Sequence, residues 1–127
     1  MRTTIRLAVF GVAACAALSG SAQTPASSVK TTYLLVYRPG PGWLPGKPLG
    51  QQPLKEHGTY MLSLYVKGVL KFAGPFLDDA GGAVVLEAES EERAKAFVDA
   101  DPAVVTKVFV AELHPWRIVD WERRLKK

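Results

Sequence analysis

The segment TTYLLVYR, residues 31–38, is the first of four strand-like runs along this chain. It is rich in aromatic and β-branched residues and stops at Pro39, so its length and its breaker predict a buried strand. Three later runs of similar character predict strands at residues 69–73, 83–89 and 107–113. The last of these is apolar on both of its faces, which is typical of a strand that is packed on two sides.

Two segments between the strands have the spacing of amphipathic helices. Pro53 suits the first turn of a helix, and apolar residues then recur every three or four positions up to Gly68, a suitable C-terminal cap. The inner face of this helix is expected to hold Leu54, His57, Met61, Leu64 and Tyr65. Ser90 is a suitable N-cap for a second helix, which ends before Pro102. The inner face of this second helix is expected to hold Ala94, Phe97 and Val98.

The resulting order, βαββαβ, predicts an α+β, ferredoxin-like fold: a four-stranded antiparallel sheet with both helices on one face. Glycine and aspartate at residues 79–82 suit the turn of a hairpin between the second and third strands. The other face of this sheet lacks a cover within the chain, although the strand at 107–113 is apolar on that side as well. We therefore expect a homodimer in which a second copy covers the sheet.

Composition limits the classes of protein to which the chain can belong. At 127 residues it has room for one domain, and its hydrophobic content of 48% suits a folded chain and not a disordered one. The single cysteine excludes an internal disulfide, and two histidines far apart predict neither a metal site nor a metal cofactor. We expect no other cofactor, because glycine-rich phosphate motifs are absent.

The N-terminus has the pattern of an export signal. Arg2 and Arg6 precede an apolar run at residues 7–18, which is shorter than the about 20 residues that a spanning helix needs. Small residues follow, and we expect cleavage after Ala22, which makes residues 1–22 a signal peptide and residues 23–30 a flexible lead-in. The mature protein would be periplasmic or secreted.

Two other interpretations of the leader remain open. The residues Val12-Ala13-Ala14-Cys15 have the form of a lipobox, in which Cys15 would carry a lipid anchor. A plain N-terminal membrane anchor is the third interpretation. Contact with a membrane is expected only through this leader or lipid.

The C-terminal residues 120–127 form a basic tail beside Trp116 and Trp121. Removal of residues 1–22 takes away Arg2 and Arg6 and lowers the net charge from +4 to +2. A net charge this small argues against nucleic-acid binding. The tail is expected to be a solvated end, or to touch an anionic surface.

A candidate pocket follows from the topology. Residues 39–53 hold five prolines and four glycines, which predicts a long loop without regular structure and a candidate cover for a cleft. This loop, the start of the first helix, the turn after the second strand and the end of the second helix all meet at one end of the fold. Side chains and backbone from these segments are expected to line a small-molecule pocket there: Trp43, Leu44, Gly74, Pro75 and Phe76.

His57 and Asp101 are the residues in this region that carry chemistry. In one interpretation Asp101 accepts a hydrogen bond from one ring nitrogen of His57, and the other ring nitrogen is then available as a general base or acid. In the other, His57 is a packed core residue whose ring is satisfied locally. Asp101 would then cap a short turn that begins at Pro102, and the two roles of Asp101 can coexist.

These residues, in their order and spacing, resemble a YCII-related (YciI-like) domain over residues 31–119. The resemblance is carried by the run at residues 33–37, Glu56-His57, Gly68-Val69-Leu70, Ala73-Gly74-Pro75, Ala83-Val84-Val85, Asp99-Ala100-Asp101-Pro102, Val108 and Pro115-Trp116. It implies a dimeric ferredoxin-like fold of the dimeric α/β barrel group, with His57 and Asp101 as the active pair. Relatives by fold in that group include muconolactone isomerases and a dehydrochlorinase. The export signal and the long loop at residues 39–53 depart from the family pattern.

Two functions are therefore expected from the sequence. The first is an exported acid–base enzyme of lyase or isomerase type that acts on small cyclic acids or phenols without a metal. The second is a non-catalytic binding or assembly module in which the His57–Asp101 pair is structural.

Overall fold

The computed structural model describes residues 28–127. The predicted signal peptide, its cleavage after Ala22 and the lipobox Cys15 all lie outside the described residues. Within residues 28–127, no helix has the length and apolar character that crossing a membrane requires.

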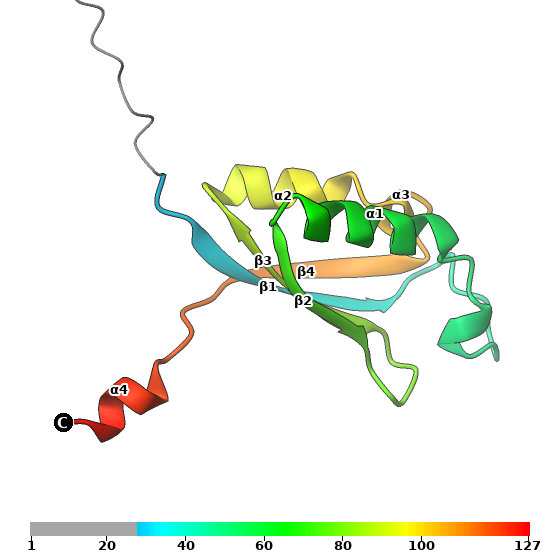
Figure 1. Cartoon of the computed structure of the whole chain (residues 1–127). Coiled ribbons are helices and arrows are strands. Elements are labelled where there is room, and N and C mark those ends of the chain that lie inside the picture. Colours follow the sequence, from blue (N-terminus) through cyan, green and yellow to red (C-terminus); the bar gives the residue numbers. More distant parts are fainter. Residues whose placement is uncertain (1–27) are drawn as a thin grey trace, which may run out of the picture.

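The fold is a four-stranded antiparallel sheet with its two main helices on one face, as the sequence predicts (Figure 1). The strands lie in the order β2-β3-β1-β4, and every neighbouring pair is antiparallel. Their bounds are β1 Thr31–Pro39, β2 Leu70–Pro75, β3 Gly82–Ala88 and β4 Phe109–Pro115. The helices that cover the sheet are α1 Lys55–Val66 and α2 Glu91–Asp99.

The core lies between the sheet and these helices. Alternate residues of β1 face it, namely Tyr33, Leu35 and Tyr37, as the period of two in a strand requires. On α2, Ala94 and Val98 are buried as predicted, and Tyr60 of α1 donates a hydrogen bond from its hydroxyl to the carbonyl of Phe97, at 2.8 Å. Helix α1 ends at Val66 with Lys67 as its C-cap, and Gly68, which was predicted as the cap, follows Lys67 with a φ of 71° in the left-handed region. Tyr65 was expected on the inner face of α1, but it is 61% exposed because it lies at the margin of the apolar stripe.

Both edge strands end later than the sequence predicts, and β4 also begins two residues later than expected, at Phe109. Residues Gly74-Pro75 were expected to end β2 but are part of it, and β4 continues to Pro115. Both are edge strands, where a proline that lacks an N–H group can point its nitrogen away from the ladder. The short turn expected after Asp101 is present as α3 Pro102–Val105, with Asp101 as its N-cap. The structure also adds two short helices that the sequence did not predict, η1 Leu49–Gln51 and α4 Trp121–Leu125.

The loop at residues 39–53 was expected to lack regular structure, and it does so except for the single turn of η1. Hydrogen bonds hold its backbone at several points. The buried side chain of Gln52 donates from Nε2 to the carbonyls of Leu44 and Lys47 and accepts from the Leu44 N–H, at 2.8–3.0 Å. Near its start, the N–H of Gly40 donates to the carbonyl of Val108 at 2.9 Å. A side chain at Gly40 would place a Cβ 2.4 Å from the carbonyl oxygen of Lys107, so the close approach requires glycine.

Gly81, in the turn between β2 and β3, lies against β1. Its φ is +118°, and a Cβ there would lie 2.0 Å from the carbonyl oxygen of Tyr37. We predict that Gly81→Ala lowers the free energy of unfolding by about 1–3 kcal/mol or more, because the new methyl group meets backbone atoms and the residue is strained. Gly50→Ala, in open space, is the matched control. Urea denaturation of both variants tests this, and equal midpoints for the two would contradict it.

Candidate functional site

His57 lies in the first turn of α1, and its ring contacts Tyr37 in the C-terminal half of β1. Its ring packs edge-on against Tyr37, with centroids 5.3 Å apart and an interplanar angle of 88°. It also packs against Phe109 of β4, at 5.4 Å and 74°. The imidazole is thus held between two aromatic rings from two strands, and its side chain is only 16% exposed. This packing restricts the ring to one orientation.

Asp101 is the fully buried partner of His57. Its backbone precedes α3 as the N-cap, and its Oδ1 accepts from the N–H of Ala103 at 2.9 Å. The Oδ2 atom accepts from the hydroxyl of Tyr37 at 2.5 Å. Both carboxylate oxygens lie 2.9 Å from Nδ1 of His57. Asp101 therefore caps a helix and contacts the histidine at the same time.

These contacts assign the hydrogen atoms around Asp101. A backbone N–H and a tyrosine hydroxyl both donate to the carboxylate, so it accepts from Nδ1 of His57 as well. Burial, together with the neighbouring Asp101 carboxylate, raises the pKa of Tyr37, which keeps its hydroxyl protonated as a donor. With its proton on Nδ1, a neutral His57 has an unprotonated Nε2, and this nitrogen makes no hydrogen bond within residues 28–127.

A cavity of about 310 Å³ adjoins the His57 ring. Its lining is mainly apolar side chains and glycine backbone: Tyr37, Leu49, Leu54, His57, Gly58, Met61, Ala73, Gly74, Pro75, Gly81, Gly82, Ala83, Val84 and Phe109. His57 is the only one of these lining residues that carries a titratable group other than a tyrosine hydroxyl. In the described part of the chain, no three His, Cys, Asp or Glu side chains are grouped so that they could hold a metal ion.

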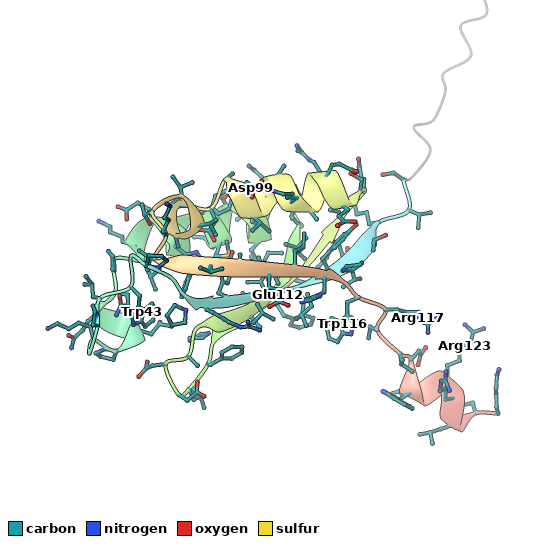
Figure 2. All side chains as sticks on the ribbon, turned by 180° about the vertical axis from the view of Figure 1, so that it is seen from behind. Trp43, Asp99, Glu112, Trp116, Arg117 and Arg123 are labelled. Atoms are coloured by element: carbon teal, nitrogen blue, oxygen red, sulfur yellow. The ribbon has the colours of Figure 1, made fainter. Side chains whose placement is uncertain are left out.

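Only two of the five residues expected to line the pocket do so. Gly74 and Pro75 line the cavity, whereas Trp43, Leu44 and Phe76 do not. Trp43 packs behind the wall, with its ring 5.8 Å from that of Phe109, at the end of the domain where Figure 2 labels it. Leu44 is 44% exposed because Gln52 holds its backbone at the surface, and Phe76 is 38% exposed in the hairpin turn.

Sequence reasoning missed Tyr37 and Phe109 as site residues. Tyr37 alternates with the buried Tyr33 and Leu35, and a buried tyrosine hydroxyl needs a polar partner. That alternation was a signal that could have placed its hydroxyl in the core. Nothing in the local sequence indicates that the partner is Asp101, which lies 64 positions further along the chain.

Tyr37→Phe tests how much the buried network contributes to stability. The substitution removes one of the donors to a carboxylate that has no access to water. We expect a loss of about 1–3 kcal/mol in the free energy of unfolding, measured by chemical denaturation. Tyr65→Phe, which removes a hydroxyl from an exposed ring on α1, is the control. A Tyr37→Phe variant as stable as this control would contradict the prediction.

Comparisons with known proteins identify the family and agree with the fold. The chain is 34% identical over 68 residues to the uncharacterized protein YjpA of Bacillus subtilis (strain 168), a match that covers 54% of this chain and 80% of YjpA. Its fold is similar to that of 5-chloro-2-hydroxyhydroquinone dehydrochlorinase (TftG) from Burkholderia phenoliruptrix AC1100, with a TM-score of 0.53 and 24% identity. That similarity covers 71% of this chain and 97% of the other. The family model described as the YCII-related domain matches residues 31–117, and the chain belongs to this family.

Proposed function

We propose that this protein is a small-molecule acid–base enzyme of lyase or isomerase type, in which His57 transfers the proton. The observation that carries the proposal is the pairing of His57 Nδ1 with a fully buried carboxylate beside a cavity. Such a pair holds the ring in one tautomer and leaves Nε2 as the reactive atom. The solved structure with a similar fold is a dehydrochlorinase in complex with 2,5-dihydroxybenzoquinone, which supports a small-molecule ligand for this fold.

The proposed reaction starts with transfer of a proton from a C–H or O–H group of the substrate to Nε2. The imidazolium that forms lies against the Asp101 carboxylate, which stabilises its positive charge. The electron pair left on the substrate then forms a new double bond. In an isomerisation, the proton returns from Nε2 to another substrate atom. In an elimination, a leaving group departs with its bonding pair, and Nε2 gives its proton to solvent.

The charge of the cavity indicates the class of substrate. Among the described residues that line it there is no lysine, arginine, aspartate or glutamate. An anionic substrate would lose its hydration without gaining a cationic partner, and it would approach the Asp101 carboxylate behind the histidine. We therefore propose an uncharged substrate, such as a phenol, a quinone or a lactone, in preference to a carboxylic acid.

The competing proposal is a binding module in which the pair only supports the fold. It is favoured by the hydrogen bond from Ala103 to Asp101, because a helix cap stabilises the protein whether or not any reaction occurs. The two proposals make different predictions for variants that keep the shape of each side chain.

His57→Gln and Asp101→Asn, tested on a panel of phenols, quinones, lactones and their carboxylate analogues, separate these functions. We expect an uncharged compound to raise the Tm of the wild-type protein and to be converted by it. Both variants should lose turnover by a factor of 10² or more. Gln has no basic nitrogen to accept the proton, and Asn at position 101 can donate to Nδ1 of His57, which would move the ring proton to Nε2. Lys55→Gln, on the exposed side of α1, is the control.

Folding of each variant is measured separately by its circular dichroism and unfolding midpoint. Binding of carboxylates in preference to uncharged analogues would contradict the proposed substrate class. Ligand binding that is unchanged in both variants, with no turnover by the wild-type protein, would favour the binding module.

We also propose that the protein is a homodimer that pairs through the open face of its sheet, the face opposite α1 and α2. Strand residues on this face include Leu34, Val36 and Val85, together with Phe72 and Val110, which are 72% and 53% exposed. The ion pairs Arg38–Glu112 and Lys71–Glu87 lie on the same face, where Glu112 is paired with Val36 and Arg38 with Val110 in the register of β1 and β4. Exposed apolar side chains interspersed with charged residues are typical of a protein interface.

Val110→Asp tests this interface. Arg38, which lies opposite Val110, already pairs with Glu112, so a second carboxylate between two facing sheets would lose its hydration without a counter-charge of its own. We therefore expect the variant to be monomeric at concentrations where the wild-type protein is a dimer. Sedimentation velocity measures both. Val105→Asp, an exposed valine on the helical side, is the matched control. A wild-type protein that stays monomeric at micromolar concentration would contradict the proposed dimer.

A further inference from the structure

The last segment of the chain, residues 116–127, leaves the domain as an arm. The N–H of Trp116 donates to the carbonyl of Thr32 at 2.8 Å. Beyond this bond, no hydrogen bond or salt bridge joins residues 117–127 to the rest of the described chain. The arm ends in α4, which is capped by Asp120 through a hydrogen bond from the N–H of Arg123. In Figures 1 and 2 the arm lies on the opposite side of the sheet from α1 and α2.

The arm exposes large apolar side chains. Trp121 is 69% exposed and Leu125 is 87% exposed, and they lie four positions apart on one side of α4. Trp116 and Ile118, in the extended part, are 42% and 58% exposed. Arg124 stacks over the Trp121 ring at 5.8 Å. Tryptophan and arginine are the residue types that contribute most to binding energy at protein interfaces.

Charge is divided between the arm and the domain. The arm has a net charge of +3, from five lysine and arginine residues against Asp120 and Glu122. Residues 28–115 carry nine lysine and arginine residues and ten aspartate and glutamate residues, a net charge of −1. The two net charges are opposite in sign and that of the domain is nearly balanced, so no net repulsion opposes contact between the arm and a second copy of the domain.

We propose that the arm of each copy packs on the domain of the other copy, so that two arms embrace the dimer. The inference rests on the proposed dimer through the open sheet face. A copy that covers this face occupies the side of the sheet to which the arm extends, so it meets the arm. A two-fold axis satisfies both arms at once and leaves none free for further assembly.

The arm tryptophans provide a direct readout of this contact. The chain has three tryptophans, so Trp43→Phe leaves Trp116 and Trp121 as the only ones. In this background, and without lipid, we expect the emission to shift to the blue and the quenching by acrylamide to fall as the protein concentration rises through the dimerisation range. A blue shift that appears only after addition of vesicles of anionic phospholipid would overturn the proposal and favour a membrane surface.

Substitutions in the arm distinguish this proposal from the sheet dimer. Trp121→Ala is expected to raise the Kd of dimerisation at least tenfold, and Arg123→Glu together with Arg124→Glu to raise it further at low salt than at high salt. Leu62→Ala, which removes an equally exposed apolar side chain from α1, should leave the Kd unchanged.

The remaining outcomes are distinct. If Trp121→Ala dimerises like the wild-type protein while Val110→Asp is monomeric, the arm proposal is wrong and the sheet dimer stands. If the wild-type protein is monomeric, both are wrong. Ligand stabilisation that depends on His57 is measured independently, so the proposed enzyme function can stand or fail separately.

Discussion

The buried carboxylate of Asp101 is the interaction on which the candidate site depends. A carboxylate without access to water costs free energy unless donors surround it, and here the donors come from three parts of the fold. Tyr37 reaches it from β1, His57 from α1, and the N–H of Ala103 from α3. Loss of any of these contacts would leave the charge less well satisfied. The same atoms thus stabilise the junction of sheet and helices and orient the imidazole.

The cavity beside His57 results from the close approach of backbone segments. Gly81 lies so close to β1 that a Cβ there would collide with the carbonyl of Tyr37. Gly82, at the start of β3, lies equally close to β2, where a Cβ would collide with the carbonyl of Gly74. The walls are glycine backbone and apolar side chains, so the cavity would select a ligand by its shape and not by its charge. The proposed specificity for an uncharged ligand rests on the absence of a compensating cation in this lining, and the proposed reactivity rests on one nitrogen of the His57 ring.

The two faces of the sheet have different roles. One face packs against α1 and α2 and positions the site, whereas the other keeps Phe72 and Val110 exposed in the isolated chain. The C-terminal arm extends to the side of this second face. The proposed assembly and the proposed chemistry therefore involve opposite sides of one sheet, so substitutions can test them separately.

Local patterns predicted the strand and helix order, because apolar periodicity and the breakers Pro39 and Gly68 act over a few residues. The resemblance of short motifs to a known family predicted the family, and together with the residue pattern it singled out His57 and Asp101, whose catalytic role is a proposal. The leader at residues 1–22 stays a prediction. Tertiary structure alone brought Tyr37 and Phe109 to the histidine, and it placed Trp43 behind the cavity wall. The reason is physical: these contacts join segments far apart in the chain, and only the packing of sheet and helices determines which side chains meet.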